Sequence, residues 1–162
     1  MITVAVLTVS DSALAGTRED LSGPALVARC QELNWRVVAA ETVGDDEAVI
    51  ARALRTWADD SQAALILTTG GTGVSARDVT PEATRGVIQK EIPGFAELMR
   101  SAGLEQTKLS MLSRALAGTR HGSLIVNLPG SPRGALHSLN AVQHLVQHVV
   151  DLLEGRTEHA SA

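Results

Sequence analysis

The chain has 162 residues, of which 44% are hydrophobic and 20% are charged, and its formal net charge is −4 at pH 7. This length fits one ordinary domain that buries roughly two-thirds of its unfolded surface, and the composition excludes an intrinsically disordered chain. Trp35, Trp57 and Phe95 are the only aromatic residues. Because single-stranded nucleic acid is bound on aromatic platforms in basic surroundings, nucleic acid is not an expected partner.

The cysteine count and the hydropathy pattern indicate the cellular context. Cys30 is the only cysteine, so the chain can form neither an internal disulfide nor a thiolate metal cluster. The apolar start, residues 1–10, lacks the basic flank and cleavage site of a signal peptide, and no apolar run approaches a membrane span. We therefore expect a cytoplasmic protein without a membrane partner, in which Cys30 is a packed thiol.

The first half of the chain alternates strand and helix patterns. Thr3–Val9 is continuously apolar and β-branched, which is typical of a central strand covered on both faces. Ser22, followed by Gly23 and Pro24, predicts the N-cap of a helix that ends near Leu33. The next predicted elements are a strand at 35–42, a helix from Asp45 or Asp46 to Asp60, and a strand at 63–68.

The second half continues this alternation. Its predicted elements are a helix that Thr80 caps and that ends at about Lys90, a helix from Pro93 to Ser101, a strand at Leu124–Leu128 and a long final helix reaching Leu153. Together the elements predict a three-layer α/β/α fold with a mainly parallel central sheet. We expect a single domain at 1–155 and a frayed C-terminal tail at 156–162.

Two predicted strands end in glycine-containing loops, Gly70-Gly71-Thr72-Gly73 after Thr69 and Pro129-Gly130-Ser131 after Leu128. Ligands of open parallel sheets bind at the carboxyl ends of the strands, so both loops are expected to line one crevice. Glycines let backbone N–H groups approach phosphate oxygens and form an anion-binding nest. The alternative interpretation is a tight turn without a ligand.

Two familiar phosphate motifs fit this loop poorly. Gly71–Ala76 matches the dinucleotide fingerprint G-x-G-x-x-A in letters, but Pro81 delays the helix that the fingerprint must open. A Walker-type loop needs a lysine followed by Ser or Thr after its last glycine, and Val74-Ser75 stands there instead. The loop therefore indicates a different phosphate-binding design.

Asp45 and Asp78 are candidate magnesium ligands. Each follows a strand end on the crevice side of the predicted sheet, and Asp78 comes five residues after the glycine loop. A carboxylate beside a polyphosphate normally acts through a divalent ion, since its own charge repels the phosphates. In the alternative interpretation, Asp45 only caps its helix and Asp78 only accepts hydrogen bonds from its own loop.

The histidines give a weaker signal. His137, His144 and His148 share one face of the final helix, but only the last two have metal-ligand spacing. Because no cysteine and no intervening glutamate accompanies them, we expect a solvated or interface face here.

Several motifs, taken in order, resemble the MogA/MoaB family of molybdenum cofactor biosynthesis proteins. The motifs are Val9-Ser10-Asp11, Asp20–Gly23, Thr69–Gly73, Arg77–Thr84, Met111–Arg114 and Asn127–Pro132, and they extend over nearly the whole chain. The resemblance implies a molybdopterin adenylyltransferase that uses ATP and Mg²⁺. Such an enzyme joins AMP to the terminal phosphate of molybdopterin and releases pyrophosphate.

The resemblance also implies roles for individual residues. Asp45 and Asp78 correspond to the catalytic, metal-binding pair, although Val43-Gly44-Asp45-Asp46 stands where the family often has Val-Pro-Asp, so Asp46 is an alternative to Asp45. The expected substrate- and nucleotide-binding residues are Ser10, Asp11, Thr69, Gly70, Gly71, Thr72, Gly73, Ser113, Arg114, Asn127, Pro129, Gly130 and Ser131.

Family membership leaves several alternatives open. A homotrimer is the expected assembly, with a hexamer as the alternative, and a downstream metal-insertion enzyme is a candidate partner. Some MoaB-type members keep the fold without the activity, so a non-catalytic molybdopterin-binding or scaffold protein is the second hypothesis. A nicotinamide-dependent oxidoreductase is the third, and the poor fit to the dinucleotide fingerprint argues against it.

Overall fold

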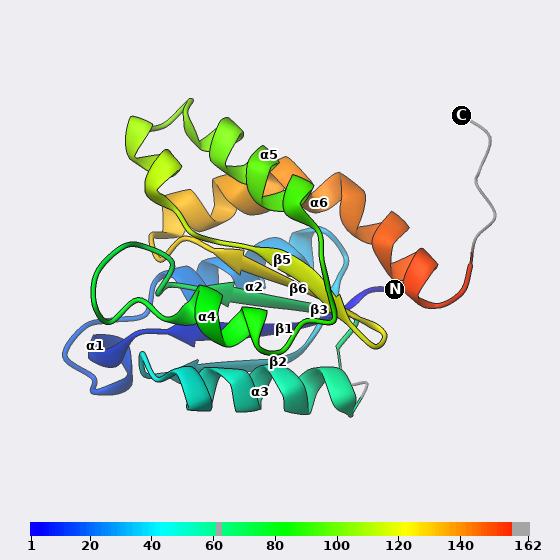
Figure 1. Cartoon of the computed structure of the whole chain (residues 1–162), viewed down its shortest axis with the longest axis horizontal. Helices are drawn as coiled ribbons and strands as arrows, with labels where there is room; N and C mark the ends of the chain where they lie inside the picture. Colours follow the sequence, from blue (N-terminus) through cyan, green and yellow to red (C-terminus); the bar gives the residue numbers. More distant parts are fainter. Residues whose placement is uncertain (61–62, 157–162) are drawn as a thin grey trace.

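A six-stranded sheet with the order β2-β1-β3-β6-β5-β4 lies at the centre of the computed structural model, which describes residues 1–60 and 63–156 (Figure 1). The strands are β1 (Thr3–Val9), β2 (Arg36–Val43), β3 (Leu65–Thr69), β4 (Lys90–Glu91), β5 (Ala117–Arg120) and β6 (Ser123–Leu128). The neighbours β2, β1, β3 and β6 run parallel, whereas β5 and β4 add an antiparallel edge. The predicted mainly parallel sheet is confirmed.

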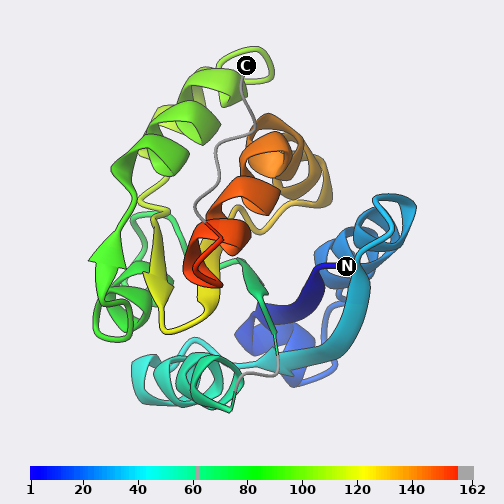
Figure 2. The ribbon, with the colours of Figure 1, turned by 90° about the vertical axis from the view of Figure 1, so that its right-hand side faces the viewer.

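Helices cover both faces of this sheet. They are α1 (Asp11–Leu14), α2 (Ser22–Glu32), α3 (Glu47–Asp59), α4 (Thr80–Arg85), α5 (Pro93–Gly103) and α6 (Pro132–Leu153), with a 3₁₀ helix, η1, at Lys108–Leu112. Figures 1 and 2 show α2, α5 and α6 on one face and α3 and α4 on the other. The three-layer α/β/α prediction is therefore confirmed.

The hydrophobic core has two parts, one on each face of the sheet. Because successive side chains of a strand alternate between faces, Val4 and Val6 of β1 pack with α2 and α6, whereas Ala5 and Leu7 pack with α3. All four side chains are almost completely buried. This double burial explains why β1 is continuously apolar rather than alternating.

Three predicted helix features are wrong in detail. Ser22 was predicted as the N-cap of α2, but the N-cap is Leu21. The Gly23 N–H in the first turn donates instead to Asp20 Oδ1, at 2.9 Å. Thr80 lies inside α4 and donates its hydroxyl to Gly70. The same helix ends at Arg85 instead of Lys90, since Gly86 follows and Lys90 pairs with Thr119 in the sheet.

The C-terminal end of α6 differs from the prediction at one residue. Arg156, assigned to a frayed tail at 156–162, donates its backbone N–H to the Asp151 carbonyl and ion-pairs with the Asp151 carboxylate at 2.6 Å. The rest of that predicted tail, 157–162, lies outside the described residues. No helix within residues 1–60 and 63–156 combines the length and the apolar character that crossing a membrane requires.

The buried position of Cys30 yields a testable expectation. Its side chain is fully buried in the core next to α6, and this burial raises the pKa of the thiol to about 11. Because the thiolate is the reactive form, we expect Ellman's reagent to label Cys30 in urea but not in the native protein. Rapid stoichiometric labelling of the native protein would contradict this packing.

Candidate functional site

The connections of the sheet open a crevice at the carboxyl ends of β1 and β3. The chain leaves β1 through α2 on one face and enters the neighbouring strand β2, then crosses through α3 on the other face to β3. The loops after β1 and β3 therefore diverge to opposite sides, which defines a topological switch point. In open α/β sheets this is where ligands bind.

A polar cavity of about 380 Å³ lies at this switch point. Eight of the predicted site residues line it: Ser10, Asp45, Thr69, Gly70, Gly71, Asp78, Gly130 and Ser131. Arg18 and Asp20, from the segment between α1 and α2, complete one side. The sheet edge thus brings together residues that are up to 121 positions apart in the sequence, from 10 to 131.

The glycine loop has a backbone conformation that other residues resist. Gly70 and Gly71 have φ angles of +101° and +68°, and a Cβ on Gly70 would lie 2.3 Å from the Val9 carbonyl oxygen. The loop is held in place by a bond from the Gly70 N–H to the Leu128 carbonyl and by one from the Thr80 hydroxyl to the Gly70 carbonyl. Within the described residues, the N–H groups of Gly71, Thr72 and Gly73 donate no hydrogen bond. These groups can serve an anion.

The structure separates the roles of Asp45 and Asp46. Asp46 is the N-cap of α3, and its Oδ1 accepts from the Val49 N–H at 3.1 Å. Asp45 instead lines the polar cavity, and its Oδ2 accepts from the Asp11 N–H at 3.0 Å. Capping therefore occupies Asp46 and leaves Asp45 facing the ligand space.

Asp45 and Asp78 give the polar cavity an unbalanced negative charge. Burial raises the pKa of Asp45 above its usual range, and the negative charges of Asp11 and Asp78 raise it further. The hydrogen bond from the Asp11 N–H lowers this pKa but does not offset the rise. Asp78 is held by its own loop, because its Oδ2 accepts from the Ser75 N–H at 2.9 Å. Carboxylates that line one cavity repel each other when both are charged, and this arrangement favours a bound cation.

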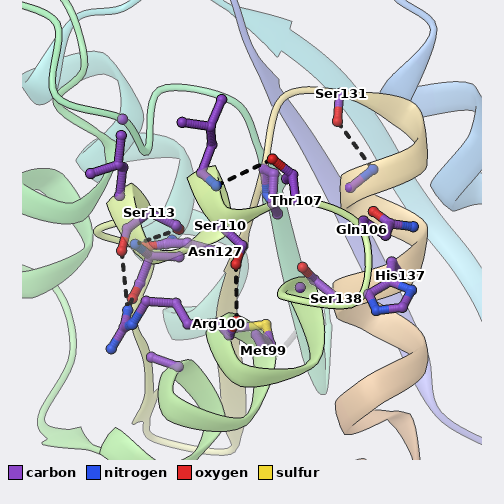
Figure 3. Close-up of a pocket in the computed structure, with 18 residues that line it drawn as sticks. Met99, Arg100, Gln106, Thr107, Ser110, Ser113, Asn127, Ser131, His137 and Ser138 are labelled. Atoms are coloured by element: carbon purple, nitrogen blue, oxygen red, sulfur yellow. Dashed lines mark hydrogen bonds between the residues drawn. The ribbon is translucent and has the colours of Figure 1, made fainter.

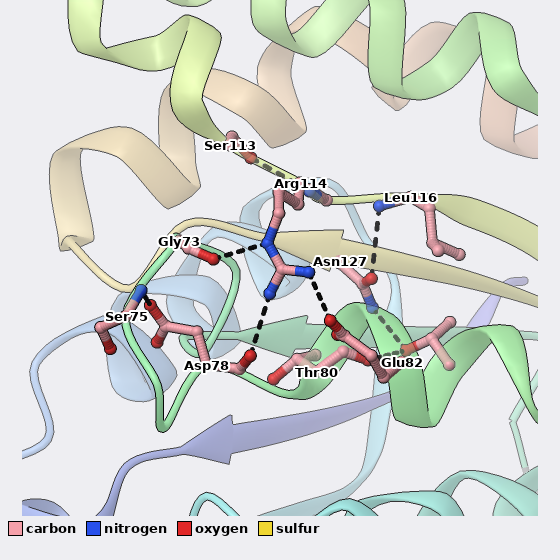
Figure 4. Close-up of polar contacts among 11 residues, drawn as sticks. Gly73, Ser75, Asp78, Thr80, Glu82, Ser113, Arg114, Leu116 and Asn127 are labelled. Carbon is pink, nitrogen blue, oxygen red and sulfur yellow. Dashed lines mark hydrogen bonds and ion pairs between the residues drawn. The ribbon is translucent and has the colours of Figure 1, made fainter.

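Arg114 fixes the far side of the glycine loop (Figure 4). Its Nε donates to the Gly73 carbonyl at 2.7 Å and its Nη2 to the Asp78 carbonyl at 2.9 Å. Its Nη1 ion-pairs with Glu82 and lowers the pKa of that carboxyl. Since the guanidinium bonds both of these backbone carbonyls, Arg114 holds together the ends of the segment from Gly73 to Asp78. Its side chain lines neither cavity.

A second cavity, of about 270 Å³, lies between α5, η1 and α6 and is mainly apolar. Met99, Leu109 and Leu112 contribute apolar surface, and Figure 3 shows Ser113 on one side with Gln106, His137 and Ser138 on the other. Ser131 lines both cavities. The two spaces therefore meet at the loop after β6.

Not every predicted site residue offers its side chain to a ligand. Asp11, Thr72 and Arg114 line neither cavity, whereas Gly73, Ser113, Asn127 and Pro129 line the apolar one. The Asn127 side chain is completely buried: its Nδ2 donates to the hydroxyls of Thr68 and Thr84, and its Oδ1 accepts from the Leu116 N–H. Its amide ties β6 to β3, α4 and the segment before β5 at the wall of the apolar cavity.

Asn127 is therefore expected to contribute to stability. Asn127→Ala leaves the buried Leu116 N–H without its side-chain acceptor and removes the donor shared by Thr68 and Thr84, so we expect a loss of about 2–4 kcal/mol in the free energy of unfolding. Urea denaturation measures this loss. Asn140→Ala is the matched control, because Asn140 is exposed on α6 and should change the free energy by less than about 0.5 kcal/mol. Equal losses would contradict a bridging role for Asn127.

Several cavity residues carry no local sequence signal. Arg100, Gln106 and His137 reach the apolar cavity only because α5 packs against α6, and no motif spans that contact. Asp20 belongs to the motif Asp20–Gly23, but it was not among the predicted site residues. Among the described residues, no three His, Cys, Asp or Glu side chains are placed to hold a metal ion together. His144 is exposed and His137 contacts the Ala102 carbonyl.

An open α/β sheet with a glycine loop and carboxylates at its switch point defines the class of α/β proteins that bind small ligands at the carboxyl ends of their strands. Residues 5–148 match the family model described as a probable molybdopterin binding domain. The chain belongs to this family, which the resemblance in the sequence had indicated.

Relatives and solved structures agree with this membership. The chain is 44% identical over 156 residues to the molybdopterin adenylyltransferase of Helicobacter pylori strain J99, covering 95% of this chain and 89% of that one. It is 36% identical to the Escherichia coli K12 molybdopterin adenylyltransferase, with 91% and 76% covered. The crystal structure of the molybdopterin biosynthesis enzyme MoaB from Thermus thermophilus superposes with a TM-score of 0.90 at 46% identity, with 96% and 98% covered.

Proposed function

We propose that this chain is a molybdopterin adenylyltransferase. A terminal phosphate oxygen of molybdopterin attacks the α-phosphorus of ATP, the bond from that phosphorus to the bridging oxygen breaks, and pyrophosphate leaves with the electron pair. The observation that carries the proposal is the meeting of Asp45, Asp78 and the glycine loop in one polar cavity that joins an apolar cavity at Ser131.

The two cavities match the two substrates in chemistry. The polar cavity, which is lined by Gly71 of the glycine loop and by Arg18, suits the phosphates of ATP, because guanidinium and backbone N–H groups bond phosphate oxygens. The apolar cavity suits a flat heterocycle, and its polar groups, Ser113, Gln106 and His137, suit the hydrogen-bonding edge of a pterin. The phosphate of molybdopterin and the α-phosphate of ATP would then meet near Ser131. The protein acts by positioning and charge neutralisation.

Asp45 and Asp78 fit a magnesium ion as its protein ligands. Mg²⁺ typically takes one or two carboxylates and completes its shell with water and phosphate oxygens, so a donor set of two carboxylates within one cavity is sufficient. The bound ion would neutralise charge on the polyphosphate. The chain's own contribution is to hold the carboxylates beside the nest, where Asp45 is kept in place by the Asp11 N–H.

Asp45 and Asp46 provide a matched test of this proposal. Asp45→Asn removes a cavity charge and should lower turnover by about 100-fold. Asp46→Asn should stay within about 3-fold of wild type, because asparagine caps a helix as well as aspartate does. Turnover is measured as pyrophosphate released from ATP and molybdopterin. Equal activity of both variants and wild type would remove Asp45 from the reaction.

A non-catalytic molybdopterin-binding or scaffold protein of the same fold is the second candidate. It predicts that the wild-type protein binds molybdopterin and releases no pyrophosphate.

The homotrimer is likewise a proposal from family membership, with the hexamer as its alternative and a metal-insertion enzyme as the acceptor of the product. Sedimentation equilibrium distinguishes the assemblies by mass, and a monomer of 17.0 kDa would contradict both.

A further inference from the structure

One exposed side chain, Asp11, contacts both loops that carry the proposed catalytic carboxylates. Its Oδ1 accepts from the Asp45 N–H at 2.8 Å, and its own N–H donates to Asp45 Oδ2 at 3.0 Å. Its Oδ2 accepts from Arg77 through Nε at 2.9 Å and contacts Nη2 at 2.8 Å. Arg77 directly precedes Asp78 in the chain. Asp11 therefore links the loop after β2 to the loop after β3.

Solvent exposure indicates what this link does. The side chains of Asp11 and Arg77 are 48% and 68% exposed, and exposed ion pairs contribute little to stability. Asp11 also lines neither cavity. The hydrogen bond from Asp45 N–H and the Arg77 guanidinium lower the pKa of Asp11. A charged residue that adds little to stability and does not reach the ligand space has its main effect on geometry.

We propose that Asp11 and Arg77 form a positioning pair that sets the spacing between Asp45 and Asp78. Asp11 accepts from the Asp45 N–H and donates its own N–H to the Asp45 carboxylate, and the backbone next to Asp78 is fixed through Arg77. Arg77 also balances the charge of Asp11, the carboxylate that bonds the Asp45 N–H. This inference rests on the proposed function, because that proposal assigns the two carboxylates.

The pair is tested with Asp11→Ala, Asp11→Asn, Arg77→Ala and the double variant Asp11→Ala/Arg77→Ala. The control is Asp59→Asn, which weakens another exposed aspartate–arginine pair, that of Asp59 Oδ1 and Oδ2 with Arg120 at 2.6 and 2.9 Å. Asp59 lines neither described cavity. The readouts are kcat, the KM for molybdopterin, the calorimetric Kd for Mn²⁺ with a non-hydrolysable ATP analogue, and the melting temperature.

Misplaced carboxylates should affect the reaction and nucleotide binding more than pterin binding. For Asp11→Ala we expect kcat to fall about 30- to 100-fold, since small misplacements cost that much, with the KM for molybdopterin within about 3-fold. The Kd for the manganese nucleotide should rise about 5- to 10-fold. Asp11→Asn should recover part of both losses, because its amide oxygen can still accept from Asp45 N–H. Asp59→Asn should match wild type.

The double variant tests whether the two residues act as one unit. Residues of one network are non-additive, so the double variant should lose about as much as Asp11→Ala alone. The proposal is overturned if the kcat losses of the two single variants multiply in the double variant, or if Arg77→Ala has the kcat and Kd of wild type. It is also overturned if Asp11→Ala has the same kcat and Kd as Asp59→Asn. If Asp11→Ala fails to fold, Asp11→Asn and Arg77→Ala decide the same question. Nucleotide binding can be measured without turnover. If the wild-type protein releases no pyrophosphate but Asp11→Ala still binds the manganese nucleotide more weakly than wild type does, the positioning pair is supported and the proposed reaction is refuted.

Discussion

Asp78→Asn is expected to reduce adenylyl transfer by about 100-fold or more while changing the Kd for molybdopterin less than about 3-fold. The substitution keeps the shape of the side chain and an oxygen that accepts from the Ser75 N–H, so the loop should stay folded. It removes one of the four carboxylates that line the polar cavity, those of Glu19, Asp20, Asp45 and Asp78. The loss should therefore appear in kcat and in metal–nucleotide binding rather than in pterin binding.

Single-turnover kinetics and fluorescence titration with molybdopterin measure these two quantities. Asp151→Asn is the control, since Asp151 is a carboxylate at the end of α6 that lines neither described cavity. A variant with full activity would show that Asp78 has no part in the reaction. An equal loss of pterin binding would instead place Asp78 in the pterin site and contradict the division of the two cavities.

Gly70→Ala is expected to lower the free energy of unfolding by about 2–4 kcal/mol. Two costs combine at this position: a φ of +101°, which an L-residue resists, and a Cβ placed 2.3 Å from the Val9 carbonyl oxygen, a backbone atom that cannot rotate away. Relief requires β1 and β3 to separate at the ends that form the polar cavity. The variant should therefore also bind ATP more weakly.

Urea denaturation with Gly16→Ala as the control isolates the close contact. Gly16 has a φ of +75° but no atom within 4 Å of its added Cβ, so this variant carries only the conformational cost, about 1–2 kcal/mol. A loss at Gly70 no larger than at Gly16 would mean that β1 and β3 are not held together as tightly as described.

The parts of the fold that follow from long apolar runs could be predicted from the sequence. Thr3–Val9 was predicted with the bounds that β1 has, because its centre, Val4–Leu7, is an unbroken apolar run, as expected of a strand buried on both faces. Lys90–Glu91 and Ala117–Arg120 were missed, since an edge strand of two residues and one containing Gly118 have neither length nor an apolar pattern. Their pairing depends on tertiary contacts.

The site shows the same division between local and tertiary information. Placing Asp45 and Asp78 at one sheet edge needed only the order of the strands. The sequence did not decide between Asp45 and Asp46, because on spacing alone either carboxylate could have accepted the cap hydrogen bond from the Val49 N–H. In the structure Asp46 accepts it, which leaves Asp45 at the cavity. The resemblance implied Asn127 as a binding residue, but its hydrogen bonds to Thr68 and Thr84 could not be predicted, because those partners come from other elements.

The most direct test of the proposed reaction follows the α-phosphate of ATP. Purified protein is incubated with molybdopterin, Mg²⁺ and ATP labelled at either the α- or the γ-phosphorus, and the products are separated. We expect the α-label in adenylylated molybdopterin and the γ-label in pyrophosphate, in equal amounts, with little product from Asp45→Asn or Asp78→Asn. Retention of both labels in ATP by wild-type protein that binds molybdopterin would contradict the proposed reaction.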